Sequence, residues 1–398
     1  MAFREADVGL RVSPAQLGVR TDYEYIVVGL GGIGSAAAYR LARKAGSDVL
    51  GLEQFELGHD SGASQDHSRI VRLSYHAPAY VRLAKGAFAA WRDLEEDSGR
   101  ALLVTTGGLD LSPAASGEDL SIYSSSLAEE GVPFELLDAA EVMKQWPQFR
   151  LSDDVSGLYQ EDAGIAPAAL CNATHAELAR RHGATLLERT QVTSISVSHG
   201  EMEVTAGDKR FRGRKLIVAA DAWTNEVLAP LDVSLPLRVT QEQVTYFRAP
   251  PDEFGPERMP VWIWLGDPCF YGIPVFGEAG IKIGQDVGGL EVTARSRTFE
   301  VDDAALGRVT AFCSEHLPGA SGDIIRTKSC LYTMPPDRDF VVDEVPGSPG
   351  VYVAQGAAHG YKFAAVFGKI LAELAVDGST EHDLSPFGFD RKFEPALF

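Results

Sequence analysis

A short apolar run followed by three spaced glycines occupies residues 25–34, Tyr25-Ile26-Val27-Val28-Gly29-Leu30-Gly31-Gly32-Ile33-Gly34. The β-branched residues before the first glycine predict a buried parallel strand. The small residues of 36–42 predict a helix directly after the glycines, and a second apolar run over 49–52 ends at Glu53. The segment therefore predicts a βαβ unit, which builds parallel sheets covered by helices.

This unit carries the features of a dinucleotide site. Gly29, Gly31 and Gly34 stand between the predicted strand and helix, where glycine permits a tight turn and lets a pyrophosphate approach the helix N-terminus. Glu53 ends the second strand, where a carboxylate accepts hydrogen bonds from an adenosine ribose. An acidic residue at this point favours NAD or FAD over NADP.

Composition limits the binding partners and the cellular compartment that we expect for the protein. The 398 residues include 56 Asp and Glu against 36 Lys and Arg, so the acidic chain is poorly suited to a phosphate backbone and we expect no nucleic-acid partner. No apolar run is long enough to span a membrane, and residues 1–22 lack the apolar core of a secretory signal. Four cysteines at irregular spacing favour a reducing compartment and no metal site. We therefore expect a cytoplasmic protein without a membrane partner.

After Glu53 the sequence predicts helices and strands, then antiparallel sheet, and then strand and helix again near the C-terminus. Helical periodicity or helix boundaries appear over 78–97, 167–183 and 362–376, and strands are expected over 186–197, 215–220 and 351–354. Short apolar runs broken by Pro and Gly over 239–284 predict antiparallel sheet. Because βαβ-type signals occur at both ends of the chain, we expect two interleaved units in an α/β (α+β) fold.

Four further segments resemble the signature segments of the monomeric sarcosine oxidase family, which also contains N-methyltryptophan oxidase, pipecolate oxidase and some fructosyl amino acid oxidases. They are SQDHSRIVR at 64–72, GIKIG at 280–284, CLYTMPPD at 330–337 and GAAHGYKF at 356–363. The resemblance runs in order from about Tyr25 to Glu381. It implies FAD rather than NAD as the cofactor.

The resemblance also implies a division of the chain. A discontinuous Rossmann-like FAD-binding domain is expected from residues 23–100, 156–235 and 326–390. A smaller substrate domain of antiparallel sheet is expected from 101–155 and 236–325, and residues 1–22 form an N-terminal extension.

The family's functional residues match particular positions of this chain. Cys330 stands where the family attaches FAD covalently. Arg72 and Lys362 match residues that hold the substrate carboxylate, and Lys282 matches a lysine near flavin N5 that helps O2 accept electrons. Further contacts implied for the cofactor or the substrate pocket are Ser64, Arg69, Gly356, Gly360, Lys362, Tyr271 and Tyr332.

The resemblance implies an oxidase of secondary amino acids, such as sarcosine or a cyclic imino acid. Such an enzyme oxidises the C–N bond to an imine, reduces O2 to hydrogen peroxide and acts as a monomer. A fructosyl amino acid oxidase of the same fold is an alternative. An NAD-dependent dehydrogenase, or a non-catalytic flavin-binding subunit, is an alternative of another class.

Simpler interpretations and departures remain open. From the residues alone, Arg69 and Arg72 could form a solvated basic face, and Lys282 could extend from its apolar strand to solvent. The family commonly carries histidine around Ser64 and Gln65, and also where Asp286 stands. Asp286 either recognises a cationic or polyhydroxylated substituent of the substrate or faces away from the pocket.

Overall fold

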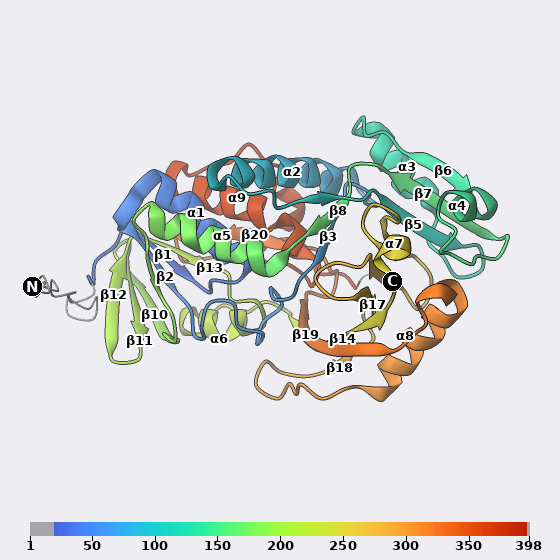
Figure 1. Ribbon diagram of the computed structural model, residues 1–398. Coiled ribbons are helices and arrows are strands. Elements are labelled where there is room, and N and C mark those ends of the chain that lie inside the picture. The colour runs from blue at the N-terminus through green and yellow to red at the C-terminus, as the bar shows by residue number, and fades with distance from the viewer. Residues whose placement is uncertain (1–19, 396–398) are drawn as a thin grey trace, which may run out of the picture.

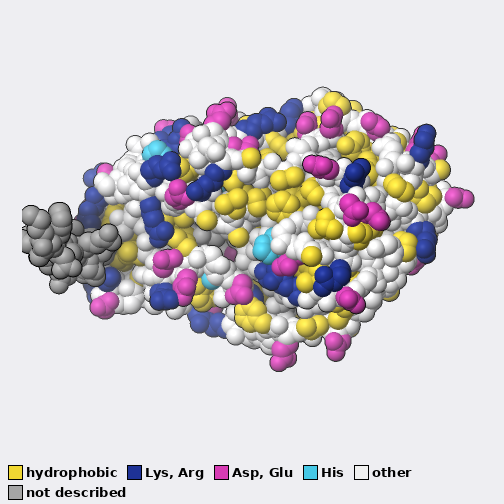
Figure 2. Space-filling model, in the orientation of Figure 1, with side chains coloured by type: hydrophobic (Ala, Val, Ile, Leu, Met, Phe, Trp, Pro, Cys, Tyr) yellow, Lys and Arg dark blue, Asp and Glu magenta, His cyan; other side chains and the backbone are white. Residues whose placement is uncertain are grey.

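The computed structural model describes residues 20–395, and Figure 1 shows their arrangement. Most of the N-terminal extension expected over 1–22 therefore lies outside the described residues. Of its described part, Asp22 forms an isolated parallel bridge with Arg212. Among residues 20–395, no helix is long and apolar enough to cross a membrane. On the face in Figure 2, Lys and Arg lie among Asp and Glu rather than in one basic stripe.

The glycine-containing segment at 25–34 forms the centre of a six-stranded sheet. Five strands are parallel, and β20 is an antiparallel edge strand. The spatial order is β20 (Val341–Glu344), β21 (Val351–Gln355), β13 (Lys215–Val218), β1 (Tyr25–Val28), β2 (Val49–Leu52) and β9 (Thr185–Leu187). The expected βαβ unit is thus β1, helix α1 (Gly32–Ala45) and β2.

Both faces of this sheet are buried, which explains why β1 is apolar throughout. Side chains alternate along a strand, so Val27 packs into the helical layer while Ile26 and Val28 pack on the opposite side. The helical layer contains α1, α2 (Pro78–Ser98), α5 (Ala168–Arg181) and α9 (Ala364–Asp377). The opposite face is covered by the three-stranded sheet β10 (Val192–Ser198), β11 (Glu201–Ala206) and β12 (Lys209–Gly213).

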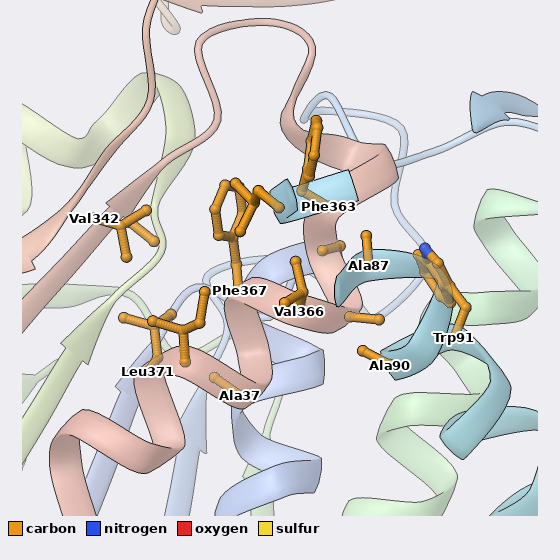
Figure 3. Close-up of a cluster of buried hydrophobic side chains, with 14 of the residues drawn as sticks. Ala37, Ala87, Ala90, Trp91, Val342, Phe363, Val366, Phe367 and Leu371 are labelled. Atoms are coloured by element: carbon orange, nitrogen blue, oxygen red, sulfur yellow. The ribbon is translucent and has the colours of Figure 1, made fainter. Parts of the chain in front are cut away.

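Helix α9 lies against α1, and small residues allow the close contact. A Cβ on Gly368 would lie 2.5 Å from a backbone atom of Ala36, so a larger residue would force these helices apart. Figure 3 shows Phe367 and Leu371 of α9 near Ala37 of α1 and Val342 of β20, in the same buried cluster. The two ends of the chain therefore share one core.

A nine-stranded sheet forms the second large layer. Its order is β18 (Leu290–Glu291), β14 (Arg238–Arg248), β17 (Gly280–Gln285), β16 (Phe270–Ile273), β15 (Val261–Trp264), β5 (Gly108–Pro113), β7 (Val155–Gln160) and β6 (Glu135–Asp138), and β19 (Ile324–Met334) pairs with β14. The sheet expected over 239–284 is largely antiparallel, but β15 pairs in parallel with β5. Helix α8 (Asp303–His316) packs on one face, where Phe312 stacks on Trp262 at 5.5 Å between ring centroids.

The remaining elements are short. A three-stranded sheet contains β3 (Arg69–Val71), β8 (Gly164–Ala166) and β4 (Val104–Thr105). The other helices are α3 (Leu120–Glu129), α4 (Ala139–Gln145), α6 (Thr224–Leu228) and α7 (Pro251–Phe254).

The expected α/β (α+β) fold class is confirmed, but two details differ. The single strand expected over 186–197 is two strands in different sheets, because the chain turns between them at Arg189, where φ is +51°. Strands β7 and β19, assigned by sequence to the FAD-binding domain, pair in the nine-stranded sheet. The domain boundaries stay a prediction.

Candidate active site

A cavity of about 1770 Å³ lies between the six-stranded and nine-stranded sheets. Pockets for drug-sized ligands measure roughly 300–1,000 Å³, so this cavity has room for a large cofactor together with a small substrate. Every site residue predicted from the sequence lines it except Gly34. The lining set comprises Gly29, Gly31, Glu53, Ser64, Arg69, Arg72, Tyr271, Lys282, Cys330, Tyr332, Gly356, Gly360 and Lys362.

The glycine turn provides an open cradle at one end of the cavity. Gly29 has φ +87°, and a Cβ on it would lie 2.4 Å from the carbonyl oxygen of Ala219. Gly34 does not reach the cavity, because it packs α1 against the strand: its Cβ would lie 1.8 Å from the carbonyl oxygen of Gly29. The backbone N–H of Gly32 donates to Ser64 Oγ at 2.9 Å. This cradle fits the pyrophosphate of a dinucleotide at the start of α1.

Glu53 is buried where β2 ends. Its Oε2 accepts from the backbone N–H of Leu30 at 2.8 Å, and its Oε1 accepts from that of Phe55 at 3.0 Å. Burial alone would raise the pKa of this carboxyl, but hydrogen bonds from His59 and the two amides outweigh it and lower the pKa. The group is therefore an ionised acceptor with lone pairs left for a ligand hydroxyl.

Arg72 and Lys362 meet in the cavity from opposite ends of the chain. Among residues 20–395, Lys362 Nζ has no carboxylate within ion-pair distance. Burial, followed by repulsion from Arg72, lowers the pKa of Lys362 to about 7. A carboxylate placed here would relieve this repulsion, so the site favours a small anionic group.

Arg72 is held by a residue that the sequence reasoning missed. Its NH1 donates to Asp110 Oδ1 at 2.7 Å, and the Asp110 carboxylate also accepts from Ser74. The Arg72 side chain is 13% exposed and its Nε has no partner, so a solvated basic face is excluded for this residue. Asp110 alternates with Leu109 and Leu111 along β5. A lone carboxylate between buried leucines was the available signal.

Lys282 points into the cavity because of strand alternation. Its neighbours Ile281 and Ile283 pack in the core beneath α8, so Lys282 faces the other side of β17. Its side chain is only 3% exposed, which rules out extension to solvent. Nζ donates to Asp66 Oδ2 at 2.7 Å and to the Ser68 carbonyl at 3.1 Å.

Cys330 lines the cavity from β19. Burial raises the pKa of its thiol, while Arg69 and Lys282 act in the opposite direction. Arg69 is fixed by hydrogen bonds from NH1 to the Ser68 carbonyl and from NH2 to the Ala63 carbonyl, both at 2.8 Å. The pKa of the thiol is raised on balance, and the two cations offset part of the cost of forming a thiolate. The other cysteines, Cys171, Cys269 and Cys313, are also free.

The wall around Tyr271 and Tyr332 contains the residue that replaces a family histidine. Asp286 lines the cavity, so it does not face away. Its Oδ2 accepts from Arg338 NH2 at 2.8 Å, and Arg338 has φ +58°. The carboxylate is therefore already paired with a cation, which argues against recognition of a cationic substituent. Arg338 was not foreseen, because the pairing spans two distant loops.

The cavity, its glycine cradle and its buried cations define a dinucleotide-dependent oxidoreductase. The FAD dependent oxidoreductase family model matches residues 24–374, and the chain belongs to this family. The cradle and the cavity volume fit FAD, and because the family is FAD-dependent the NAD-dependent alternative is set aside. Among residues 20–395, no group of three or more His, Cys, Asp and Glu is arranged to hold a metal ion.

Two named relatives match nearly the whole chain. The chain is 30% identical to "Monomeric sarcosine oxidase" of Arthrobacter sp. (strain TE1826), over 96% of this chain and 98% of the relative. It is 30% identical to "N-methyl-L-tryptophan oxidase" of Salmonella arizonae, over 93% and 99%. The resemblance to the monomeric sarcosine oxidase family is thus confirmed. Among solved structures, NikD, "an unusual amino acid oxidase essential for nikkomycin biosynthesis", superposes with a TM-score of 0.82 at 27% identity, covering 95% of this chain and 98% of NikD.

Proposed function

We propose that the protein oxidises secondary amino acids with FAD as its cofactor and O2 as electron acceptor. The observation that carries this proposal is the unpaired Lys362 ammonium beside Arg72, in a cavity large enough for FAD and a substrate. Relatives named sarcosine oxidase and N-methyl-L-tryptophan oxidase support an N-alkylated amino acid as the substrate class.

The cofactor site is assigned to residues that line one part of the cavity. Gly29 and Gly31 receive the pyrophosphate, Glu53 accepts from the adenosine ribose, and Ser64, Arg69, Gly356 and Gly360 surround the remainder. When bound, FAD would supply the redox chemistry that oxidises the C–N bond to an imine and reduces O2 to hydrogen peroxide.

The substrate carboxylate is assigned to Lys362 and Arg72. Lys362 has no carboxylate of the described residues within ion-pair distance, whereas Arg72 lines the cavity and is oriented by Asp110. Two cations that converge on one group fix its position, and this orients the reacting carbon. Tyr271 and Tyr332 form the wall beside this anion site and exclude water from it.

Lys282 is assigned to the reduction of O2. A buried, fixed ammonium stabilises negative charge that develops on oxygen, because no solvent has to reorganise around it. Cys330 is assigned to covalent attachment: its Sγ would hold the flavin through the 8α carbon, and O2 would accept the two electrons released as the thiol and that carbon each lose a proton.

A fructosyl amino acid oxidase remains the second candidate, because the paired Asp286 and Arg338 present both acceptors and donors to a hydroxylated substituent. We also propose a monomer in the cytoplasm.

The test uses purified, flavin-loaded protein mixed anaerobically with N-methyl amino acids, cyclic imino acids and fructosyl amino acids. Bleaching of the flavin absorption by at least one amine, followed by peroxide formation on admission of air, is the expected result. A protein that no secondary amine bleaches contradicts the proposal.

A further inference from the structure

Asp66 adopts a backbone conformation with positive φ. Its φ is +96°, in the region that glycine enters without steric cost and other residues enter rarely. Its side chain is 3% exposed and lines the cavity. Strained, buried polar residues of this kind concentrate at functional sites, so the carboxylate calls for an explanation beyond packing.

The Asp66 carboxylate accepts hydrogen bonds from side chains of three strands. Oδ2 accepts from Lys282 Nζ of β17 at 2.7 Å and from the Tyr246 hydroxyl of β14 at 2.8 Å. Oδ1 accepts from Lys328 Nζ of β19 at 3.3 Å. Arg69 and Arg326 lie farther away, at 3.9 Å and 4.0 Å. The shortest ion pair that Asp66 forms is therefore the one with Lys282.

Lys282 has no other carboxylate within ion-pair distance among the described residues. Arg69 of β3 repels the Lys282 charge. The Cys330 thiol of β19 and the Tyr246 ring are further titratable groups near the Lys282 ammonium. Burial first, and then Arg69, lower the pKa of Lys282 to about 8, and Asp66 opposes both effects. Arg326 is occupied by Glu278, which His67 also contacts, on the outer side of the cluster.

We propose that Asp66 is a positioning residue that holds the Lys282 side chain in the cavity as a fixed, charged ammonium. The proposal rests on the proposed function, because it takes Lys282 to face the flavin. Asp66 acts through Lys282 and touches neither substrate nor the reacting atoms. Its bond to Tyr246 fixes the carboxylate, and the carboxylate then fixes the ammonium.

The test measures sulfite binding to the oxidised holoenzyme as a function of pH. Sulfite adds to flavin N5, and a nearby positive charge stabilises the anionic adduct, so bleaching of the flavin absorption reports charge without turnover. Sulfite itself and other groups also titrate in this pH range. Dividing the sulfite affinity of the wild type by that of Lys282→Met at each pH removes these effects and leaves the contribution of Lys282. In the wild type this ratio should fall as pH rises through about 8.

The decisive variant is Asp66→Gly, because glycine suits a φ of +96° and the fold keeps its backbone. Loss of an opposite charge within about 4–6 Å shifts a pKa by about 1–3 units. In the Asp66→Gly protein, the pH at which the Lys282-dependent affinity ratio falls should therefore be lower than in the wild type by at least about one unit. Asp66→Asn, which also tolerates positive φ, should show the same displacement. Glu278→Gln is the matched control: it removes a carboxylate paired with Arg326 and should leave the profile in place.

The outcomes separate the two proposals. If wild type and Lys282→Met bind sulfite equally at every pH, Lys282 does not face the flavin and its assigned role fails. If the ratio depends on Lys282 but neither Asp66 variant moves it, the role of Asp66 is refuted while the function stands. The proposal is also refuted if Asp66→Gly changes sulfite affinity as much in the Lys282→Met protein as it does in the wild type, because Asp66 then does not act through Lys282.

Discussion

Replacing Lys362 with methionine tests the substrate-binding assignment most directly. Methionine keeps an unbranched apolar stem and removes the charge. Because no carboxylate of the described residues pairs with Nζ, the substitution leaves no buried partner behind. Removal of one charge-assisted contact of about 1.5–3 kcal/mol should weaken carboxylate binding by about 10- to 150-fold.

The same residue predicts how binding depends on pH. An anion requires the protonated ammonium, and the free site has a pKa of about 7, lowered first by burial and then by Arg72. Affinity for a carboxylate should therefore be full well below this pH and decrease as pH rises through it. Because deprotonation removes the same contact as the substitution, the loss between pH 7 and pH 9 is about 5- to 30-fold. In Lys362→Met this pH dependence should disappear.

The assay titrates oxidised holoenzyme with acetate and with acetamide and follows the flavin absorption. The acetate-to-acetamide affinity ratio isolates the effect of the anionic charge. Lys369→Met is the matched control, because Lys369 lies on α9 and pairs with Glu381 outside the cavity. The reasoning is refuted if the wild-type ratio is flat from pH 7 to pH 9, or if Lys362→Met keeps the full wild-type ratio.

Four further substitutions have defined outcomes. Cys330→Ser should leave all flavin in the supernatant after acid precipitation, whereas the wild-type peptide containing Cys330 should carry the flavin mass; free flavin from fully loaded wild type would exclude the attachment. Lys282→Met should slow reoxidation of the reduced enzyme by O2 by about 10²-fold or more, measured by stopped flow, and an unchanged rate would remove its assigned role. Asp110→Asn breaks a buried ion pair with Arg72 and should lower the free energy of unfolding by about 3–5 kcal/mol in denaturant titrations, so a loss below about 1 kcal/mol would show that Arg72 does not need this partner. Gly34→Ala places a methyl group against the Gly29 carbonyl and should abolish flavin loading, while Gly307→Ala, which meets no atom within 4 Å, should load normally; a fully loaded Gly34→Ala protein would contradict the role of this contact.

Local patterns predicted the βαβ unit and, of the cavity lining, Gly29, Gly31 and Glu53. Glycine spacing and the apolar runs around it are local properties, and so they place β1, α1 and β2 within a few residues. The resemblance, rather than periodicity, pointed to Cys330 and Lys362, since neither residue has a local feature that reveals its chemistry.

The missed residues share a different physical origin. The contacts of Asp66 with Lys282, of Asp110 with Arg72, and of Asp286 with Arg338 join residues far apart in the chain. No periodicity encodes which distant carboxylate will neutralise a buried cation. Positive φ at Asp66 and Arg338 is likewise imposed by surrounding structure and not by residue type.

The order of strands in the six-stranded sheet also has a consequence for biosynthesis. β13 lies between β1, made near the start of the chain, and β21, which ends at Gln355. The cavity wall at Gly356, Gly360 and Lys362 follows β21 directly. A nascent chain still attached to the ribosome near residue 340 therefore lacks one side of the cavity, even though its glycine turn was synthesised long before. The cavity therefore has all its walls only after the C-terminal segment has left the exit tunnel, and until then the edges of the parallel strands beside β21 stay exposed.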